Sequence, residues 1–296
     1  MHADMTTSAT PRVALLYLIL VPWILVRAYI PPYMTLPAAP TLPDASITGY
    51  VNLTNGVDIW YAQFGPSLEE SYARGKIPVL FLHGAHASSA YWGNQIQYLL
   101  CQNDPSTILA IDSRLMGRST YGDMTTSFAL KAADTIAVLD HFGIARAAVV
   151  GWSNGAVVLV NLLLDYPSRI ERAFVFGAAY DASTSINRTT DTAQYNATGA
   201  IYFERTLEEL SRLSVNPELV PAARQAYYEE YQREPHWNST DFARIPTPFE
   251  NCGDSPVVWY VEGAEEEVTT KGVAKIMHEW TSGSGLVVLP DVSHFA

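Results

Sequence analysis

The stretch "VVGWSNGAVV", residues 149–158, places Ser153 between Gly151 and Gly155 at the spacing G-x-S-x-G. The run "AAVVGW" before the serine is typical of a buried strand, and "NGAVVLVNLLLDY" after it is typical of a helix. On such a strand-turn-helix corner the serine backbone is strained, and side chains at residues 151 and 155 would collide with neighbouring backbone. Glycine at both positions relieves that crowding, so the stretch predicts a nucleophilic serine at a sharp turn.

Further apolar runs surround this stretch at helix-length intervals. They cover residues 77–84, 106–112, 147–152, 172–180, 256–263 and 285–290. Short strands that are apolar on both faces favour a parallel sheet covered by helices on each side. Ahead of them, Asn55-Gly56 between two strand-like runs predicts an antiparallel hairpin. The predicted fold class is therefore α/β, with a mostly parallel, doubly wound sheet.

One interval breaks this alternation. Residues 182–255 separate two consecutive strands by far more than an ordinary loop, and they contain helical patterns near 199–213 and 218–232 with many aromatic residues. We expect a helical cap inserted into a core formed by residues 47–181 and 256–296.

The N-terminal 30 residues differ from the rest of the chain. Residues 13–26 are uncharged and lie between Arg12 and Arg27. At about 1.5 Å per residue they span roughly 21 Å, less than the roughly 30 Å of a bilayer core. This predicts a secretory signal peptide within residues 1–30, with an uncleaved signal anchor as the alternative. Residues 31–46 carry five prolines and are expected to form a linker.

A secretory route is also consistent with four N-x-S/T sequons. Their asparagines are Asn52, Asn187, Asn196 and Asn238. Cys101 and Cys252 permit one disulfide in an oxidising compartment, but only their separation decides whether they pair. We therefore expect a secreted glycoprotein, or a single-pass membrane protein if the anchor is retained.

Composition excludes several classes of partner. Asp and Glu number 30 against 18 Lys and Arg, which gives a net charge of -12 and disfavours nucleic acid and anionic lipid. Membrane contact is expected only through an uncleaved anchor. No C-x-x-C pair or His/Cys cluster with zinc-ligand spacing is present, so the sequence implies no metal and no cofactor.

A serine nucleophile needs a base and an acid that orients the base. His294 follows the last predicted strand, at the same carboxyl edge of the sheet as Ser153. The loop after residues 256–263 offers the consecutive acids Glu265, Glu266 and Glu267. Asp181, after the preceding strand, is a second source and Asp254 a weaker third, so the residues alone leave the acid open.

The negative charge that develops on a substrate oxygen needs preorganised N–H donors. The amide of Asn154 stands at the start of the predicted helix, and Ala85 lies in the loop "HGAHA" after the first parallel strand. His83 in that loop is better placed to shape it than to act as the base.

The ordered set HG, DSR, GWSNG, G-x-x-E and a late His resembles the α/β-hydrolase family. The stretches "DSRLMGRST" (112–120) and "VGWSNGA" (150–156) are similar to a branch that includes biphenyl-hydrolase-like and valacyclovir-hydrolase-like esterases. The resemblance implies the α/β-hydrolase fold, Ser153 as nucleophile, His294 as base, and Ala85 and Asn154 as oxyanion donors. It also implies Glu266 as the acid, three residues after Gly263, with Glu265 and Asp181 as alternatives.

The chain departs from that branch at several positions. Asn154 replaces the usual Asp and Ala156 the second Gly, while Leu115 and Met116 stand where Gly and a polar residue are common. Family members usually continue into a closing helix, so we expect either a truncated sequence or a loosely held His294. The expected function is a serine hydrolase that cleaves esters or related acyl bonds of hydrophobic small molecules. The alternative is a secreted hydrolase-like binding protein without turnover.

Overall fold

The computed structural model describes residues 29–184, 192–246 and 255–295. The chain divides into residues 1–30 and 31–296, and every element below belongs to the second unit. Residues 1–28 of the predicted signal segment, Asn187, Cys252 and Asp254 lie outside the described residues. Within the described ranges, no helix is long and apolar enough to cross a membrane.

The strands form one mixed sheet. They are β1 (Ile47–Asn52), β2 (Asp58–Phe64), β3 (Val79–Leu82), β4 (Ile108–Ile111), β5 (Ala147–Trp152), β6 (Ile170–Phe176), β7 (Val257–Gly263) and β8 (Gly285–Leu289). Their order is β1-β2-β4-β3-β5-β6-β7-β8. β1 and β2 form the predicted hairpin, β2 also pairs antiparallel with β4, and the remaining pairs are parallel. The predicted α/β class with a mostly parallel sheet is confirmed.

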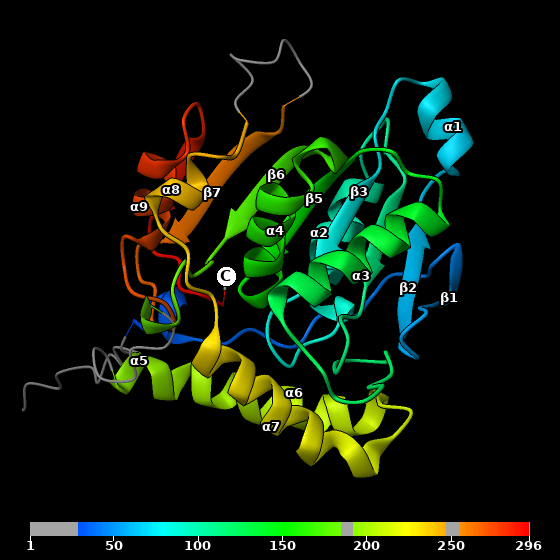
Figure 1. Cartoon of the computed structure of the whole chain (residues 1–296). Coiled ribbons are helices and arrows are strands. Elements are labelled where there is room, and N and C mark those ends of the chain that lie inside the picture. The colour runs from blue at the N-terminus through cyan, green and yellow to red at the C-terminus, as the bar shows by residue number, and fades with distance from the viewer. Residues whose placement is uncertain (1–28, 185–191, 247–254, 296) are drawn as a thin grey trace, which may run out of the picture. The chain divides into compact units, whose positions relative to one another are not determined.

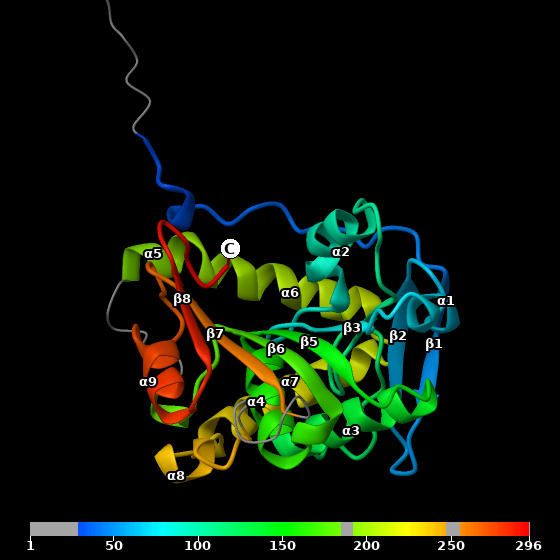
Figure 2. The same ribbon diagram turned by 90° about the horizontal axis from the view of Figure 1, so that it is seen from above.

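Helices cover the sheet and one of its ends. They are α1 (Leu68–Ala73), α2 (Gly93–Leu100), α3 (Phe128–His141), α4 (Asn154–Asp165), α5 (Thr192–Ala197), α6 (Gly199–Leu213), α7 (Val220–Arg233), α8 (Ser239–Phe242) and α9 (Val273–Trp280). Short 3-10 turns lie at Pro32–Met34, Ser89–Trp92, Pro167–Arg169, Ala182–Thr184 and Pro217–Leu219. Figure 2 shows the sheet between α2 on one face and α3, α4 and α9 on the other.

Helix α3 illustrates how local sequence fixes an element. The Ser127 hydroxyl accepts a hydrogen bond from the Leu130 amide at 3.0 Å and so caps the first turn. At the other end Gly143 adopts φ 64, the left-handed conformation in which helices commonly stop. The apolar side chains between these ends pack against α4 and the sheet.

Helices α6 and α7 occupy the interval in which the sequence predicts two helices, and both predictions are confirmed within a few residues. They run next to each other across one end of the sheet (Figure 1). A buried ion pair joins α7 to the core, since Lys131 Nζ on α3 lies 2.5 Å from Glu230 Oε2. Glu234 also accepts a hydrogen bond from the Phe128 amide at 3.1 Å. These contacts hold α7 over the carboxyl ends of the strands.

Candidate active site

Ser153 stands on a sharp turn between β5 and α4, with φ 54 and ψ -118. A Cβ on Gly151 would lie 2.5 Å from the carbonyl oxygen of Gly155. A Cβ on Gly155 would collide with the carbonyl of Leu82 on the neighbouring strand β3. A side chain at residue 151 would therefore push β5 away from α4, and one at residue 155 would push α4 away from β3. Glycines two residues before and two residues after the serine therefore allow β5 and α4 to pack closely, with Ser153 in the sharp turn between them.

His294 and Glu266 form a buried pair. Nδ1 of His294 lies 3.0 Å from Oε2 and 2.8 Å from Oε1 of Glu266, and the two residues are 1% and 3% exposed. Oε1 of Glu266 also accepts hydrogen bonds from the amides of Val268 and Thr269, both at 2.9 Å. The carboxylate is thus fixed from its own loop, and it in turn fixes the orientation of the imidazole.

The protonation of this pair follows from its surroundings. Burial by itself lowers the pKa of His294, but the charges of Glu266 and Glu267 and the hydrogen bond that His294 donates to Glu266 together raise it above its ordinary value. Burial by itself raises the pKa of Glu266, but His294 and the two backbone amides together lower it. The carboxylate is therefore ionised at neutral pH, where it stabilises a positive charge on the imidazole.

Backbone contacts hold His294 near the end of the chain. Its amide donates to Oε2 of Glu267 at 2.8 Å, and its carbonyl accepts the indole N–H of Trp152 at 2.8 Å. The ring of Phe295 is buried against Tyr202, with centroids 4.6 Å apart. His294 is therefore enclosed and bonded on both sides of its peptide, rather than loosely held.

Gly177 brings the pair next to Ser153. The Ser153 amide donates to the carbonyl of Phe176 at 2.9 Å, which joins the serine turn to the end of β6. Gly177, the next residue, has φ 66, and a Cβ there would lie 2.9 Å from Cε1 of His294. Nε2 of His294 faces away from Glu266 and is buried without a hydrogen-bond partner among the described residues. The imidazole thus lies beside the serine turn with a free nitrogen.

The alternative acids have other partners. Oε2 of Glu265 lies 3.0 Å from Nζ of Lys271. Oδ2 of Asp181 lies 2.8 Å from Nδ1 of His236, and this contact, with that of Ser183, lowers the pKa of Asp181 to about 2. Among the acids that the structure describes, Glu266 is the one whose side chain contacts the His294 ring. Asp254 lies outside the described residues.

Both predicted oxyanion donors lie near Ser153, one next to it in the chain and one in the wall of the same cavity. Asn154 is the first residue of α4, where amide groups have no partner within the helix. Ala85 lines the same cavity as Ser153, and its carbonyl accepts the hydroxyl of Tyr202 at 2.7 Å. His83 shapes this loop, since its Nε2 accepts the Ser113 amide at 3.0 Å and its Nδ1 bonds the Gly84 carbonyl.

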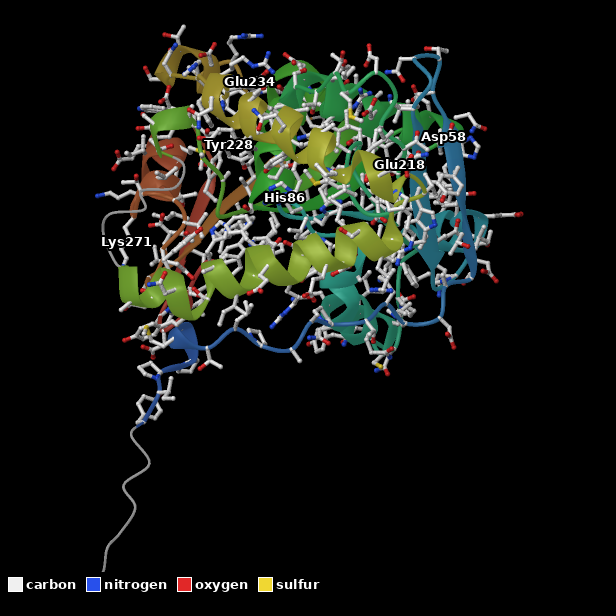
Figure 3. The ribbon with its side chains drawn as sticks, turned by 90° about the horizontal axis from the view of Figure 1, so that it is seen from below. Asp58, His86, Glu218, Tyr228, Glu234 and Lys271 are labelled. Carbon is white, nitrogen blue, oxygen red and sulfur yellow. The ribbon has the colours of Figure 1, made fainter. Side chains whose placement is uncertain are left out.

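A cavity of about 1110 Å³ opens at Ser153 beneath the helices α6 and α7. Its aromatic lining includes Tyr195, Phe203, Tyr227, Tyr228 and Tyr231. His86 projects between α6 and α7 (Figure 3), with its ring 4.5 Å from that of Tyr227. Burial, reinforced by the charges of Arg224 and Lys131, lowers the pKa of His86 to about 3, so this ring is neutral. The cavity therefore offers a large surface next to the serine, in which these aromatic rings lie among polar side chains such as Arg224 and Gln225.

The motif D-S-R supports the loops beneath the cap. Arg114 and Asp134 form a buried two-bond ion pair at 2.5 and 2.6 Å. Leu115, at the position where the branch commonly has glycine, adopts φ 65 and packs with residues of both α6 and α7. The backbone there keeps the conformation that suits glycine, while the leucine side chain adds a contact to the cap.

The remaining sequence predictions concern sites outside this cavity. Asn52, Asn196 and Asn238 are exposed, as glycosylation requires. Cys101 is an exposed thiol, and its candidate partner Cys252 lies outside the described residues. In the parts of the chain that the structure covers, no three His, Cys, Asp or Glu side chains are placed to hold a metal ion.

A family model described as the alpha/beta hydrolase family matches residues 79–296. The chain belongs to the alpha/beta hydrolase family. This confirms the resemblance found in the sequence motifs. One similar solved structure is that of Est816, titled an N-acyl homoserine lactone degrading enzyme. The superposition covers 83% of the present chain and 93% of the Est816 chain. The TM-score is 0.59 and the identity 23%, so this similarity concerns the fold.

Curated relatives match a shorter part of the chain. A bifunctional esterase/perhydrolase of Acinetobacter calcoaceticus is 32% identical over 120 residues, which is 40% of each chain. A non-heme chloroperoxidase of Streptomyces lividans is 28% identical over 131 residues, which is 44% of each chain. The chain thus spans less than half the length of these two relatives, whose names cover different reactions.

The sequence reasoning missed the residues that hold the candidate site together. Glu267 entered only as one of three adjacent acids, and its contact with the His294 amide was not foreseen. Trp152 ends the predicted strand, as the structure confirms, but the bond of its indole to the His294 carbonyl was not foreseen. A buried polar contact between distant segments leaves no periodic signal, so sequence patterns could not reveal either one.

Proposed function

We propose that this chain is a serine hydrolase that cleaves carboxylic esters or related acyl bonds of hydrophobic small molecules through an acyl-enzyme. The observation that carries the proposal is the arrangement of Ser153, on its glycine-flanked turn, beside the buried His294–Glu266 pair at the wall of one large cavity. These are the parts that nucleophilic acyl transfer needs: a nucleophile, a base, and an acid that orients the base.

In the proposed reaction the Ser153 hydroxyl oxygen attacks the substrate carbonyl carbon while Nε2 of His294 takes the hydroxyl proton. The carbonyl oxygen becomes an oxyanion that the amides of Ala85 and Asn154 bind. Collapse of this intermediate breaks the bond to the leaving alcohol, which receives the proton from Nε2. Water then repeats the sequence on the acyl-serine and releases the acid. Glu266 stays ionised and stabilises the imidazolium in both steps.

The proposed substrate class follows from the cavity walls. Aromatic rings from α5, α6 and α7 line the space next to Ser153, and such surfaces bind apolar groups. The volume of about 1110 Å³ is larger than a short acyl group needs. A substrate with a bulky hydrophobic acyl or alcohol group fits this lining best.

The test combines covalent labelling with an ester panel. Wild-type protein should react with a fluorophosphonate probe and hydrolyse p-nitrophenyl esters, with a preference for longer or aromatic acyl groups. Ser153→Ala should lose both activities while retaining the wild-type unfolding midpoint. Labelling of folded wild type that is no stronger than that of Ser153→Ala would favour the alternative, a hydrolase-like binding protein without turnover.

We also propose that the protein enters the secretory pathway, as a secreted protein or with its N-terminal segment as an anchor. The apolar run at residues 13–26 and the exposed sequons at Asn52, Asn196 and Asn238 support this. Expression of the full chain in a eukaryotic host, followed by glycosidase treatment of the medium and the membrane fraction, tests it. A full-length, unglycosylated protein in the cytosol would contradict the proposal.

A further inference from the structure

Three buried polar side chains recur every fourth residue at the start of the cap. Gln194, Thr198 and Tyr202 are 3%, 0% and 2% exposed. Helix α5 ends and α6 begins at Thr198, yet the amide of Thr198 bonds the Gln194 carbonyl and that of Tyr202 bonds the Thr198 carbonyl. The two helices follow each other almost end to end (Figure 3), so the three side chains share one face. We call Gln194, Thr198 and Tyr202 the donor stripe.

Two members of the donor stripe bond the loop that carries the proposed acid. Nε2 of Gln194 donates to the carbonyl of Glu265. The Thr198 hydroxyl lies 2.7 Å from Oε1 of Glu267 and 2.9 Å from the Gln194 carbonyl, so these two acceptors share its proton. The other oxygen of Glu267 accepts the His294 amide at 2.8 Å. A single carboxylate therefore connects Thr198 of the cap to the backbone of His294.

The third member bonds the opposite side of the candidate site. The hydroxyl of Tyr202 donates to the carbonyl of Ala85, whose own amide is the proposed oxyanion donor. The Ala85 amide and carbonyl lie in adjacent rigid peptide planes that meet at one Cα, so a hydrogen bond on the carbonyl restricts how the amide can turn. The Tyr202 ring also packs against Trp152, which precedes Ser153, and Phe295, which follows His294.

From these contacts we propose that the donor stripe positions the proposed catalytic groups, with Tyr202 fixing the oxyanion loop and Thr198 fixing the His294 loop through Glu267. The inference rests on the proposed function and extends it: the start of α6 is a structural part of the catalytic machinery as well as a wall of the substrate cavity. The three residues act through Ala85, Glu265 and Glu267, so they are positioning residues and do not touch the reacting atoms.

The size of the expected effect follows from the geometry that acyl transfer requires. Loss of a whole oxyanion donor costs about 100- to 1000-fold in kcat, and misplacement of reacting groups by about 1 Å costs on the order of 100-fold. Removal of one positioning hydroxyl shifts a donor without deleting it, so a loss of roughly 10- to 50-fold is expected. Substrate binding in the aromatic cavity does not use these hydroxyls, so KM should stay within about twofold.

The experiment compares hydroxyl deletions with matched controls on the full chain. Tyr202→Phe and Thr198→Val should each lower kcat for a p-nitrophenyl ester by roughly 10- to 50-fold with little change in KM. Thr198→Ser keeps the hydroxyl and should recover most of the activity. Thr206→Val removes a buried hydroxyl from α6, and the bonds that this hydroxyl makes are to carbonyls within α6 itself. Tyr260→Phe removes a buried hydroxyl that bonds Thr281 on the core. Both controls should keep the wild-type kcat.

A measurement that does not depend on turnover accompanies the kinetics. Amide hydrogen exchange should increase in residues 84–88 for Tyr202→Phe and in residues 264–270 for Thr198→Val, and in neither loop for Thr206→Val. An active wild type in which Tyr202→Phe and Thr198→Val keep normal kcat would overturn the donor stripe but leave the proposed function intact. A wild type without activity would overturn the proposed function, and unchanged exchange in both loops would then overturn the stripe separately.

Discussion

Gly177 lies so close to the imidazole of His294 that a methyl group on its Cα would be 2.9 Å from Cε1 and 3.0 Å from Nδ1 of that ring. Gly177 follows β6, and His294 comes from the last loop described. The contact shows why the loop after β6 must carry glycine: it fills the space between the serine turn and the His294–Glu266 pair with backbone alone.

Gly177→Ala should therefore impair catalysis much more than stability. The new methyl group displaces the His294 ring, and displacement of about 1 Å costs on the order of 100-fold in kcat. Gly143→Ala is the matched control, because Gly143 has φ 64 and nothing lies within 4 Å of its added Cβ. Both variants pay about 1 kcal/mol or more for a left-handed alanine. Equal kcat values in ester hydrolysis would show that the methyl group is accommodated and that the close packing is not required.

Replacement of the acids should separate Glu266 from its neighbours. Glu266→Gln removes the charge that stabilises the imidazolium, and the analogous change in a known serine hydrolase triad lowers kcat by about 10,000-fold. Glu265→Gln and Asp181→Asn alter groups that contact Lys271 and His236, so each should lose less than about threefold. Steady-state kinetics with one ester gives kcat for the three variants. If Glu265→Gln or Asp181→Asn lost more kcat than Glu266→Gln, the residue replaced in that variant would be the acid that orients His294.

The pH dependence of activity should report the same pair. His294 acts as a base only when neutral, and its environment raises its pKa above the ordinary value of 6.5, so the acid limb of kcat/KM should lie above that value. Glu266→Gln removes the larger of the two charges that raise the pKa of His294, and burial, which lowers that pKa, then outweighs the remaining effect of Glu267. The acid limb of the residual activity should therefore move to lower pH. A limb that stays in place or moves to higher pH would exclude His294–Glu266 pairing as its origin.

The same shifts predict how the pair contributes to folding. The pKa of Glu266 is lowered by folding, so its contribution is present above its unfolded pKa and is lost as pH falls through the folded pKa. The pKa of His294 is raised, so its contribution is lost as pH rises through the folded pKa. The difference in the free energy of unfolding between wild type and Glu266→Gln should therefore be largest at pH values between the folded pKa of Glu266 and that of His294. Urea unfolding at several pH values measures this difference.

Sequence patterns predicted the parts of this fold that repeat. The parallel strands, the hairpin at Asn55-Gly56, α4 and the two cap helices all follow from periodicity and turn residues. The short helices α1, α2, α5 and α8 were not predicted, and neither was the antiparallel pairing of β2 with β4. Such features depend on tertiary packing, which overrides weak local preferences.

Some residues of the candidate site could likewise be predicted from the sequence, and others could not. Ser153, His294 and Ala85 could be placed because each lies in the turn or loop after a strand, and carboxyl ends of parallel strands meet at one edge. Glu266 could be chosen among adjacent acids only through the family resemblance, since spacing alone does not say which carboxylate turns inward. The roles of Glu267, Thr198 and Tyr202 could not be found, because they arise from hydrogen bonds between segments that lie 27, 69 and 117 residues apart in sequence.

The buried ion pair between α3 and α7 should dominate the attachment of the cap. Lys131 and Glu230 are 1% and 0% exposed at their side chains, and Nζ of Lys131 also lies 4.8 Å from the centre of the Tyr227 ring. Burial lowers the pKa of Lys131 even though Glu230 opposes this effect. Removal of one partner leaves an uncompensated buried charge, so Glu230→Gln should lower the free energy of unfolding by about 3–5 kcal/mol.

A double variant tests whether that loss is the cost of the unpaired charge. Lys131→Met combined with Glu230→Gln removes both charges, and apolar replacement of a buried pair is often neutral, so much of the lost stability should return. Urea unfolding of the two single variants and the double variant gives the coupling energy, with Lys275→Met and Glu279→Gln on the exposed face of α9 as a reference pair worth less than about 1 kcal/mol. Strictly additive losses at Lys131 and Glu230 would mean that the two charges do not stabilise each other, and that apolar contacts such as those of Leu115 hold α7 in place instead.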